Sequence, residues 1–298
     1  MVPRGPPVAV DLSGHRPAGP PSTISPVKVR AFYWDPRPQG TLSKLRRRRH
    51  RNWVHGNAGD IFNIDLVHWA YQGHQIVNTT TEGPRLLLVG SVARLVHGGD
   101  LVNGIGAKGN DALPPAADGV ATIRGLRGPL TLEAFKRAGH DVSDVRFLAD
   151  PGLLIGKIHP DLYDVEAVPN RVIDIPHYRQ RGRANSDPQV EVVDIDADPH
   201  TIGREIRRAE LIYTSSLHGL IWAHALGRPV VLTEPPAEEP RFKYEDYLLS
   251  VGETLGSTPS IEEALAARTP TDPVDVTGVI DSITMPDIVE LKAAGIAS

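Results

Sequence analysis

Short apolar runs recur along the chain and alternate with segments in which apolar residues follow a helical spacing. The clearest example spans residues 211–234, where apolar runs at 211–213 and 230–232 flank a helical pattern at 217–226. Thr214, Ser215 and Ser216 supply N-cap hydroxyls, and Gly227 stands where a helix-ending glycine belongs. The pattern predicts a parallel β–α–β unit, whose functional edge is the carboxyl end of its strands.

The same alternation extends through most of the chain. Further strands are predicted at residues 27–34, 75–77, 85–89, 101–105, 120–123, 145–148, 172–176 and 190–195. Helices are predicted at residues 60–70, 129–138, 198–209 and 261–267 and from 286 onward. The pattern loosens over residues 156–170, between two successive β/α series. We therefore expect an α/β fold with two Rossmann-like doubly wound domains facing a cleft. The expected division is a flexible tail at 1–26, an N-terminal domain at 27–160 and a C-terminal domain at 161–298.

Composition narrows the class of protein. Apolar residues make up 40% of the 298 residues and charged residues 23%, which is typical of a soluble globular chain. The formal charge of −4 argues against a general nucleic-acid partner. The absence of cysteine excludes disulfides and thiolate metal sites, and no apolar run has the length of a membrane span or the form of a signal peptide. The expected location is the cytoplasm.

The basic run KLRRRRHR at residues 44–51 raises a second possibility for location. Such a run can be a solvated loop, or it can attract an anionic surface. The second interpretation predicts peripheral association with the inner face of the membrane.

His218 lies in the first turn of the central predicted helix, beside the hydroxyls of Ser215 and Ser216. Free backbone N–H groups and the helix dipole attract anions to such a place. A histidine there can donate to a phosphate or carboxylate, or act as a general acid. A histidine that only packs at the turn has the same local pattern, so both interpretations stay open.

Two other turns have compositions that suit a ligand. Asn57 and Gly59 belong to a small-residue turn, and Asp60 after it is expected to cap the helix that follows. A glycine turn that opens a helix permits close backbone approach to a ligand. The turn lacks the three spaced glycines of a dinucleotide fingerprint. Arg124 and Arg127 lie between a strand end and the helix-starting Pro129, where arginines can clamp carboxylate or phosphate. The first segment is equally well explained as a capped turn without a ligand. The second is equally well explained as two solvated loop arginines.

Taken together, eight segments resemble the polysaccharide pyruvyltransferase family. In chain order they are GNAGD at 56–60, LLLVGS at 86–91, NGIGAKG at 103–109, RGPLTLEAFKRAG at 127–139, ADPGLL at 149–154, IPHY at 175–178, SSLHGLIWAHALGRPVV at 215–231 and KYEDYLLSVG at 243–252. The resemblance covers roughly residues 27–255. It implies a GT-B-like architecture with the active site between the domains.

The activity implied is transfer of pyruvate from phosphoenolpyruvate to two hydroxyls of a sugar in an exopolysaccharide or cell-surface glycan. The products are a cyclic ketal and free phosphate. The partners implied are phosphoenolpyruvate and a sugar or lipid-linked oligosaccharide acceptor. No cofactor is expected beyond this donor. No metal is expected either, because the histidines lie in separate segments without metal-ligand spacing.

The resemblance assigns the donor to Arg127 and His218. Asp60 and His177 are the candidates for activating the acceptor hydroxyl, because both fall at predicted loop edges that face the cleft. Many members have an arginine immediately before LHG, where this chain has Ser216. The candidates to replace that cation are Arg124, Arg241 and Lys243. The other expected substrate contacts are Asn57, Gly59, Ser215, Ser216 and Leu217.

Two alternatives remain at this point. A nucleotide-sugar glycosyltransferase of GT-B type would share the architecture, since fold does not fix chemistry. A catalytically inactive glycan-binding homologue would account for Ser216 in place of arginine.

Overall fold

The computed structural model of the chain describes residues 27–35, 53–72, 74–79, 83–109, 113–116, 120–182, 187–268 and 271–298. The predicted tail at 1–26 and the basic run at 44–51 lie outside the described residues. The predictions made for them stay predictions.

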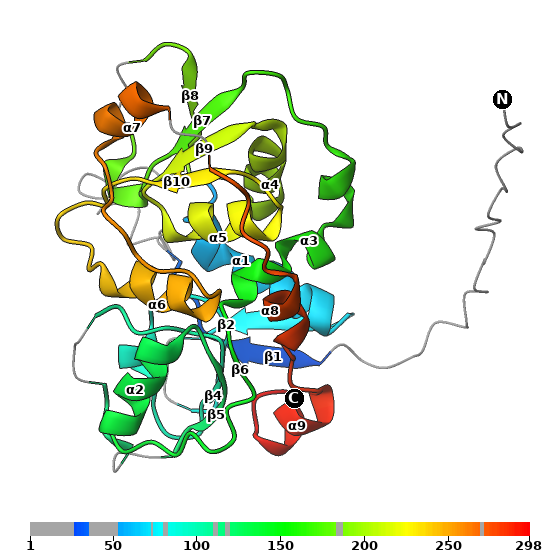
Figure 1. Ribbon diagram of the computed structural model, residues 1–298. Helices are drawn as coiled ribbons and strands as arrows, with labels where there is room; N and C mark the ends of the chain where they lie inside the picture. Colours follow the sequence, from blue (N-terminus) through cyan, green and yellow to red (C-terminus); the bar gives the residue numbers. More distant parts are fainter. Residues whose placement is uncertain are drawn as a thin grey trace, which may run out of the picture.

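Two parallel sheets organise the described residues (Figure 1). One has six strands in the order β2-β1-β3-β4-β5-β6, and the other has four in the order β10-β9-β7-β8. The strands are β1 (Lys28–Ala31), β2 (Gln75–Asn78), β3 (Leu86–Leu87), β4 (Leu101–Asn103), β5 (Thr122–Leu126), β6 (Phe147–Leu148), β7 (Val172–Ile175), β8 (Val190–Val192), β9 (Leu211–Thr214) and β10 (Val230–Leu232). All the strands predicted from short apolar runs are present, and the α/β class is confirmed.

Both sheets begin with the same strand order. In each sheet the strand that comes first in the sequence lies between the second and the third: β1 lies between β2 and β3, and β7 lies between β8 and β9. The direction of winding therefore reverses between β1 and β3, and again between β7 and β9. In parallel α/β sheets, ligands bind outside the carboxyl ends of the strands at such a reversal. The strand order alone thus indicates two places where functional residues are expected.

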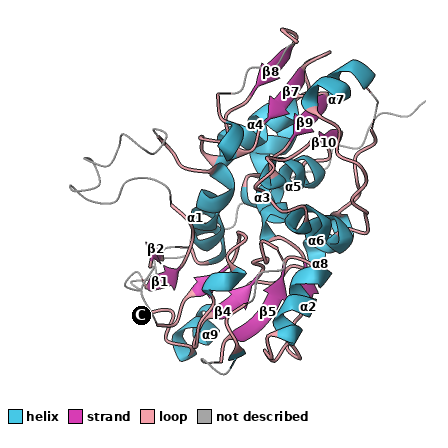
Figure 2. Ribbon diagram, turned by 90° about the vertical axis from the view of Figure 1, so that its left-hand side faces the viewer, coloured by secondary structure: helices cyan, strands magenta, loops and turns pink. Residues whose placement is uncertain are grey.

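Helices surround and separate the two sheets, and Figure 2 shows α1, α5 and α6 between them. The helices are α1 (Ala58–Ala70), α2 (Pro129–Arg137), α3 (Ile155–Ile158), α4 (Pro199–Arg208), α5 (Leu217–Ala225), α6 (Phe242–Ser250), α7 (Ile261–Ala267), α8 (Thr277–Ser282) and α9 (Ile288–Ala293). Within the described ranges, no helix combines the length and apolar character needed to span a bilayer.

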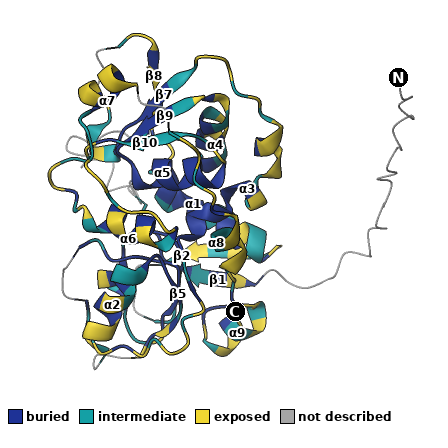
Figure 3. Ribbon diagram, in the orientation of Figure 1, coloured by how far each residue is buried: buried dark blue, intermediate teal, exposed yellow. Residues whose placement is uncertain are grey.

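The central helix α5 is buried along its whole length (Figure 3), because LHGLIWAHA is apolar on nearly every side. The Ser216 hydroxyl caps its start by accepting a hydrogen bond from the Gly219 N–H. Gly227 follows its end with a φ of 64°, in the left-handed region that favours glycine. Both predicted ends of this helix are therefore confirmed.

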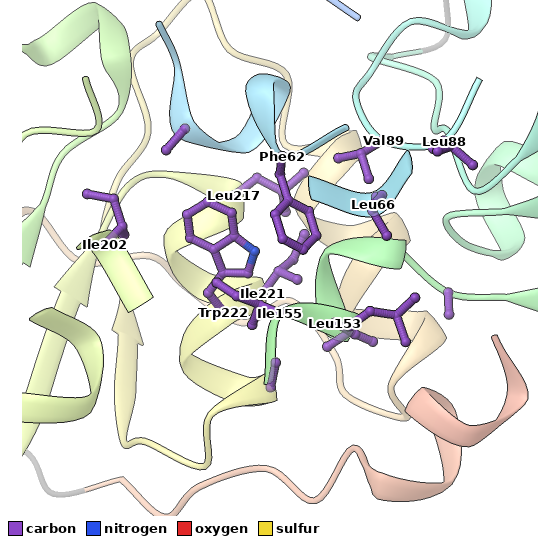
Figure 4. Close-up of a cluster of buried hydrophobic side chains, with 14 of the residues drawn as sticks. Phe62, Leu66, Leu88, Val89, Leu153, Ile155, Ile202, Leu217, Ile221 and Trp222 are labelled. Atoms are coloured by element: carbon purple, nitrogen blue, oxygen red, sulfur yellow. The ribbon is translucent and has the colours of Figure 1, made fainter. Parts of the chain in front are cut away.

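α1 packs against α5 in the middle of the molecule. The ring of Phe62 meets the indole of Trp222 edge to face, with 5.6 Å between centroids (Figure 4). One continuous cluster of buried apolar side chains extends from this contact into both sheets, from Leu86 on β3 to Ile212 on β9. The two sheets thus share a core through the helices between them.

The chain passes from the first sheet to the second between β6 and β7, and its last residues return to the first sheet. Lys28 donates its backbone N–H to the carbonyl of Ser298, and Arg30 donates to that of Ile296. The Tyr71 hydroxyl donates to the carbonyl of Pro286. Residues 286–298, which the predicted division groups with the second half, therefore lie against the first.

Candidate functional site

The amino-terminal ends of α1 and α5 meet directly, although they are far apart in sequence. A Cβ atom built on Gly59 would overlap the imidazole ring of His218. The adjacent Ala58 N–H donates to the carbonyl of Ile195, beyond β8. The small-residue turn in GNAGD is thus required for close approach, but to a histidine of this chain.

Asp196 fixes the turn that leads into α1. Its carboxylate accepts hydrogen bonds from the backbone N–H groups of Val54, His55 and Gly56, the shortest at 2.8 Å. Burial alone would raise the pKa of Asp196, but these three donors and the Arg181 guanidinium lower it. The second half of the chain therefore holds the entry to α1 with an ionised carboxylate.

His218 is buried at the start of α5, beside the carboxyl end of β9. Burial, with the nearby charges of Lys243 and Arg127, lowers the pKa of its imidazole to about 3. The ring is therefore neutral at physiological pH. Its Nε2 atom is buried and makes no hydrogen bond with any described residue. Such an atom is free to donate to or accept from a bound molecule.

Asp60 lies in the first turn of α1, where its carboxylate accepts a 2.7 Å hydrogen bond from the Asn57 amide. The helix N-cap is Asn57, so Asp60 does not cap α1 as its position suggested. Burial raises the pKa of Asp60 to about 6, against the lowering effects of Asn57 and Lys243. A carboxyl with a pKa near neutrality can exchange a proton at physiological pH.

Lys243, on α6, lies between two groups near the carboxyl end of β7. Its Nζ atom is 2.7 Å from Glu239 and 3.4 Å from Nε2 of His177. Burial lowers the pKa of Lys243 to about 8, although Glu239 opposes the shift. Burial and the charge of Lys243 lower the pKa of His177 to about 3. The result is a charged lysine beside a neutral imidazole.

Arg127 is fully buried, and each of its three guanidinium nitrogens has a partner within the protein. It donates to the carboxylate of Asp246 at 3.0 Å, to the hydroxyl of Ser91 at 2.8 Å and to the carbonyl of Ala107. Asp246 also accepts from the backbone and hydroxyl of Thr131. Asp246 thus largely neutralises the charge of Arg127. Arg127 therefore acts on His218 only electrostatically, and its guanidinium is not open to a ligand.

Two of the three cations considered as replacements at the Ser216 position lie elsewhere. Arg124 is paired with Glu290 on α9 and with Asp144. Arg241 donates to Thr258 and to the carbonyl of Gly256. Lys243 alone of the three influences both Asp60 and His218 electrostatically.

The residues before His218 are partnered within the protein. The Ser215 hydroxyl donates to Gln180 and accepts from the backbone N–H of His177. Its carbonyl accepts from the Tyr244 hydroxyl, and Ser216 serves as the N-cap of α5. Leu217 is buried in the shared core. These contacts tie the segment that precedes His218 to the segment that carries His177, across the reversal between β7 and β9.

Sequence reasoning missed several charged residues of this region. Lys108 and Arg179 both contact Glu239, and the carboxyl of Asp150 accepts from the Gly152 N–H next to Arg127. Glu239 lies four residues before Lys243, a spacing that can signal an ion pair. Asp150 follows a predicted strand in ADPGLL, a position typical of functional side chains.

A separate hollow of about 490 Å³ opens beside the second half of α5, between β10, α6 and the segment at 271–275. Leu220, Val230 and Leu248 contribute apolar walls, and Glu253, Asp272 and Asp275 are the charged lining residues. Its described lining residues include no lysine or arginine that could bind an anion. We therefore locate the candidate site at the ionisable cluster of Asp60, His177, His218 and Lys243.

The protein is thus an α/β protein with two parallel sheets, and its ionisable cluster lies near the carboxyl ends of their strands. Among the described residues, no group of three or more His, Asp or Glu side chains is arranged to hold a metal ion. The cluster is therefore one of cations, neutral histidines and carboxyls.

Comparison with known proteins gives a family match over part of the chain and a similar sequence. Residues 116–234 match the family described as "Polysaccharide pyruvyl transferase", which confirms the family that the motifs predict. A second similar sequence is "Uncharacterized protein L143" of Acanthamoeba polyphaga mimivirus, 29% identical over 188 residues. The matched region covers 58% of this chain and 62% of that protein. No solved structure matches the chain.

Gly59→Ala is predicted to destabilise the protein through its clash with His218. Overpacking of this kind costs about 1–3 kcal/mol in free energy of unfolding, which urea denaturation measures. The same change made in a His218→Ala background should be neutral or stabilising, because alanine favours a helix over glycine by about 1 kcal/mol. Equal costs in the two backgrounds would contradict the contact.

Asp150→Asn tests a carboxyl whose pKa, like that of Asp60, is raised by burial. Burial raises the pKa of Asp150 to about 6. Between the unfolded pKa of about 4 and this value, the folded protein binds the extra proton, so wild type gains stability as pH falls. Acidification from pH 7 to 4 should therefore stabilise wild type relative to Asp150→Asn by up to about 3 kcal/mol.

Urea denaturation at each pH measures this difference. Asp141 is the matched control, because the pKa of this exposed carboxyl is lowered by hydrogen bonds from Ser143. Asp141→Asn should show no such relative gain for wild type. A difference that stays constant with pH in Asp150→Asn would refute the raised pKa.

Proposed function

We propose that this protein transfers pyruvate from phosphoenolpyruvate to two hydroxyls of a sugar in an exopolysaccharide or cell-surface glycan. The observation that carries the proposal is the convergence of His218, Asp60 and Lys243 where α1 and α5 meet. This site combines a cation, a neutral imidazole and a carboxyl that titrates near neutrality. The family match supports the same transferase class.

The proposed reaction needs a proton donor, a proton acceptor and charge stabilisation. The enol methylene of phosphoenolpyruvate takes up a proton and becomes a methyl group. One sugar hydroxyl attacks the adjacent carbon, phosphate leaves, and the second hydroxyl closes the ketal. Of the two hydroxyl protons released, one balances the methyl group and the other leaves on hydrogen phosphate.

His218 is the proposed partner of the donor. A neutral imidazole with an unpaired buried Nε2 can hydrogen-bond to an anionic ligand without a charge penalty. Binding of a multiply anionic donor beside it would raise its pKa and allow it to deliver a proton. Asp60, with a pKa of about 6, is the proposed base for the acceptor hydroxyl.

Lys243 is the proposed substitute for the arginine that many family members carry before LHG. It comes from a different segment, α6, but its charge reaches the same histidine. His177 beside it is a second candidate for contact with the acceptor. The two-domain, GT-B-like arrangement with a division near residue 160 is part of this proposal. No further cofactor is required by it.

Lys243→Met should weaken phosphoenolpyruvate binding about tenfold or more, because a charge-assisted hydrogen bond to the donor is lost. Methionine retains the length and apolar character of the stem. Isothermal titration of the purified chain measures the change. Lys136→Met is the control, since Lys136 is exposed on α2 and pairs with Glu133 of the same helix.

Parallel titrations with UDP and UDP-glucose separate the alternatives. Binding of the nucleotides in place of phosphoenolpyruvate would favour a glycosyltransferase. Binding of neither, with retained glycan binding, would favour the inactive homologue.

His218→Ala should lower kcat by about 10²–10⁴-fold, by more than it raises KM, if the imidazole delivers the proton. Release of inorganic phosphate from phosphoenolpyruvate, with a panel of glycosides that present two nearby hydroxyls, measures both constants. A change in KM alone would reduce His218 to a binding residue.

A further inference from the structure

A single buried carboxylate holds three cations near the candidate site. The side chain of Glu239 is 1% exposed. Its oxygens lie 3.1 Å from Nζ of Lys108, 2.9 Å from Nε of Arg179 and 2.7 Å from Nζ of Lys243. The three cations come from separate segments, which follow β4, follow β7 and form α6. We call Lys108, Arg179, Lys243 and Glu239 the Glu239 cluster.

The Glu239 cluster carries more positive charge than negative charge. Three cations share Glu239, and Asp60 is a further carboxyl that interacts electrostatically with Lys108 and Lys243. His177, which touches Lys243, is neutral because of its lowered pKa. The cluster therefore stays net positive even when Asp60 is ionised. By contrast, Arg127 is matched one to one by Asp246.

The cluster is also open at one end. Lys243 and Glu239 are buried, whereas the side chains of Lys108 and Arg179 are 32% and 43% exposed. A lysine ammonium has three donors and a guanidinium has five, so one contact with Glu239 leaves further N–H groups on each. A molecule approaching from solvent can thus reach the remaining N–H groups of Lys108 and Arg179, which lie together beside Glu239.

We propose that Lys108, Arg179 and Lys243 form a subsite for the phosphate group of a small phosphorylated molecule. Cations converging on one carboxylate suit a compact ligand group that carries two charges and several acceptor oxygens. Lys243 links this subsite to the proposed site, because its Nζ atom lies 3.4 Å from Nε2 of His177 and its charge acts on His218 and Asp60.

The identity of the ligand as phosphoenolpyruvate rests on the proposed function, whereas the preference for phosphate follows from the cluster itself. In this arrangement Lys108 and Arg179 bind phosphoenolpyruvate, whereas Arg127 is fully buried and bonds to Asp246, Ser91 and Ala107. The donor would then be held by residues from both halves of the chain.

Calorimetric titration of the full chain with inorganic phosphate, phosphoenolpyruvate and pyruvate tests the subsite. Lys108→Ala and Arg179→Ala should each raise the Kd for phosphate and for phosphoenolpyruvate about tenfold. Any binding of pyruvate, which lacks phosphate, should change by less than twofold. Lys136→Ala, at an exposed lysine of α2, is the control and should leave all three unchanged.

The outcomes separate the subsite from the reaction. Phosphate affinity within twofold of wild type in both variants, or no phosphate binding by wild type, would overturn the subsite. Turnover of phosphoenolpyruvate with an unchanged KM in both variants would keep the reaction and reject the subsite. Weakened phosphate binding in both variants, without turnover of phosphoenolpyruvate by wild type, would keep the subsite and reject the proposed reaction. Circular dichroism of each variant verifies that it is folded.

Discussion

The packing of α1 against α5 is the contact on which the candidate site depends. Phe62 and Trp222 bury their rings together, and one turn earlier the backbone at Gly59 lies against the imidazole of His218. Interiors are close-packed, so side chains held this way cannot shift independently. The same apolar contact that joins the two sheets therefore sets the distance between the carboxyl on α1 and the histidine on α5.

Burial determines the chemical character of the site more than pairing does. Desolvation lowers the pKa of His177 and His218, so both imidazoles are neutral, and it raises the pKa of Asp60 toward neutrality. Full charges are kept where several partners support them, as at Arg127 and Glu239. The protein thus places acid–base groups in dry surroundings and gathers unmatched cations toward solvent.

The sequence predicted local structure well because local structure depends on nearby residues. Ser216 and Gly227 mark the two ends of α5, and the short apolar runs became parallel strands. Partners across the chain could not be predicted in the same way. Arg124 and Arg241 looked like donor ligands, yet each has partners elsewhere, such as Glu290 and Thr258. Glu239 was missed because its role depends on cations more than fifty residues away, except for Lys243.

The return of residues 296–298 to β1 has a consequence for the order of folding. This pairing joins the first described strand to the last described residues, so it closes one of the longest loops that the chain can form. Loop closure of that length carries an entropic cost that must be met before the contact stabilises anything. Contacts between residues distant in sequence also slow folding. We therefore expect the pairing of residues 296–298 with β1 to form late, after the strands of both sheets have paired.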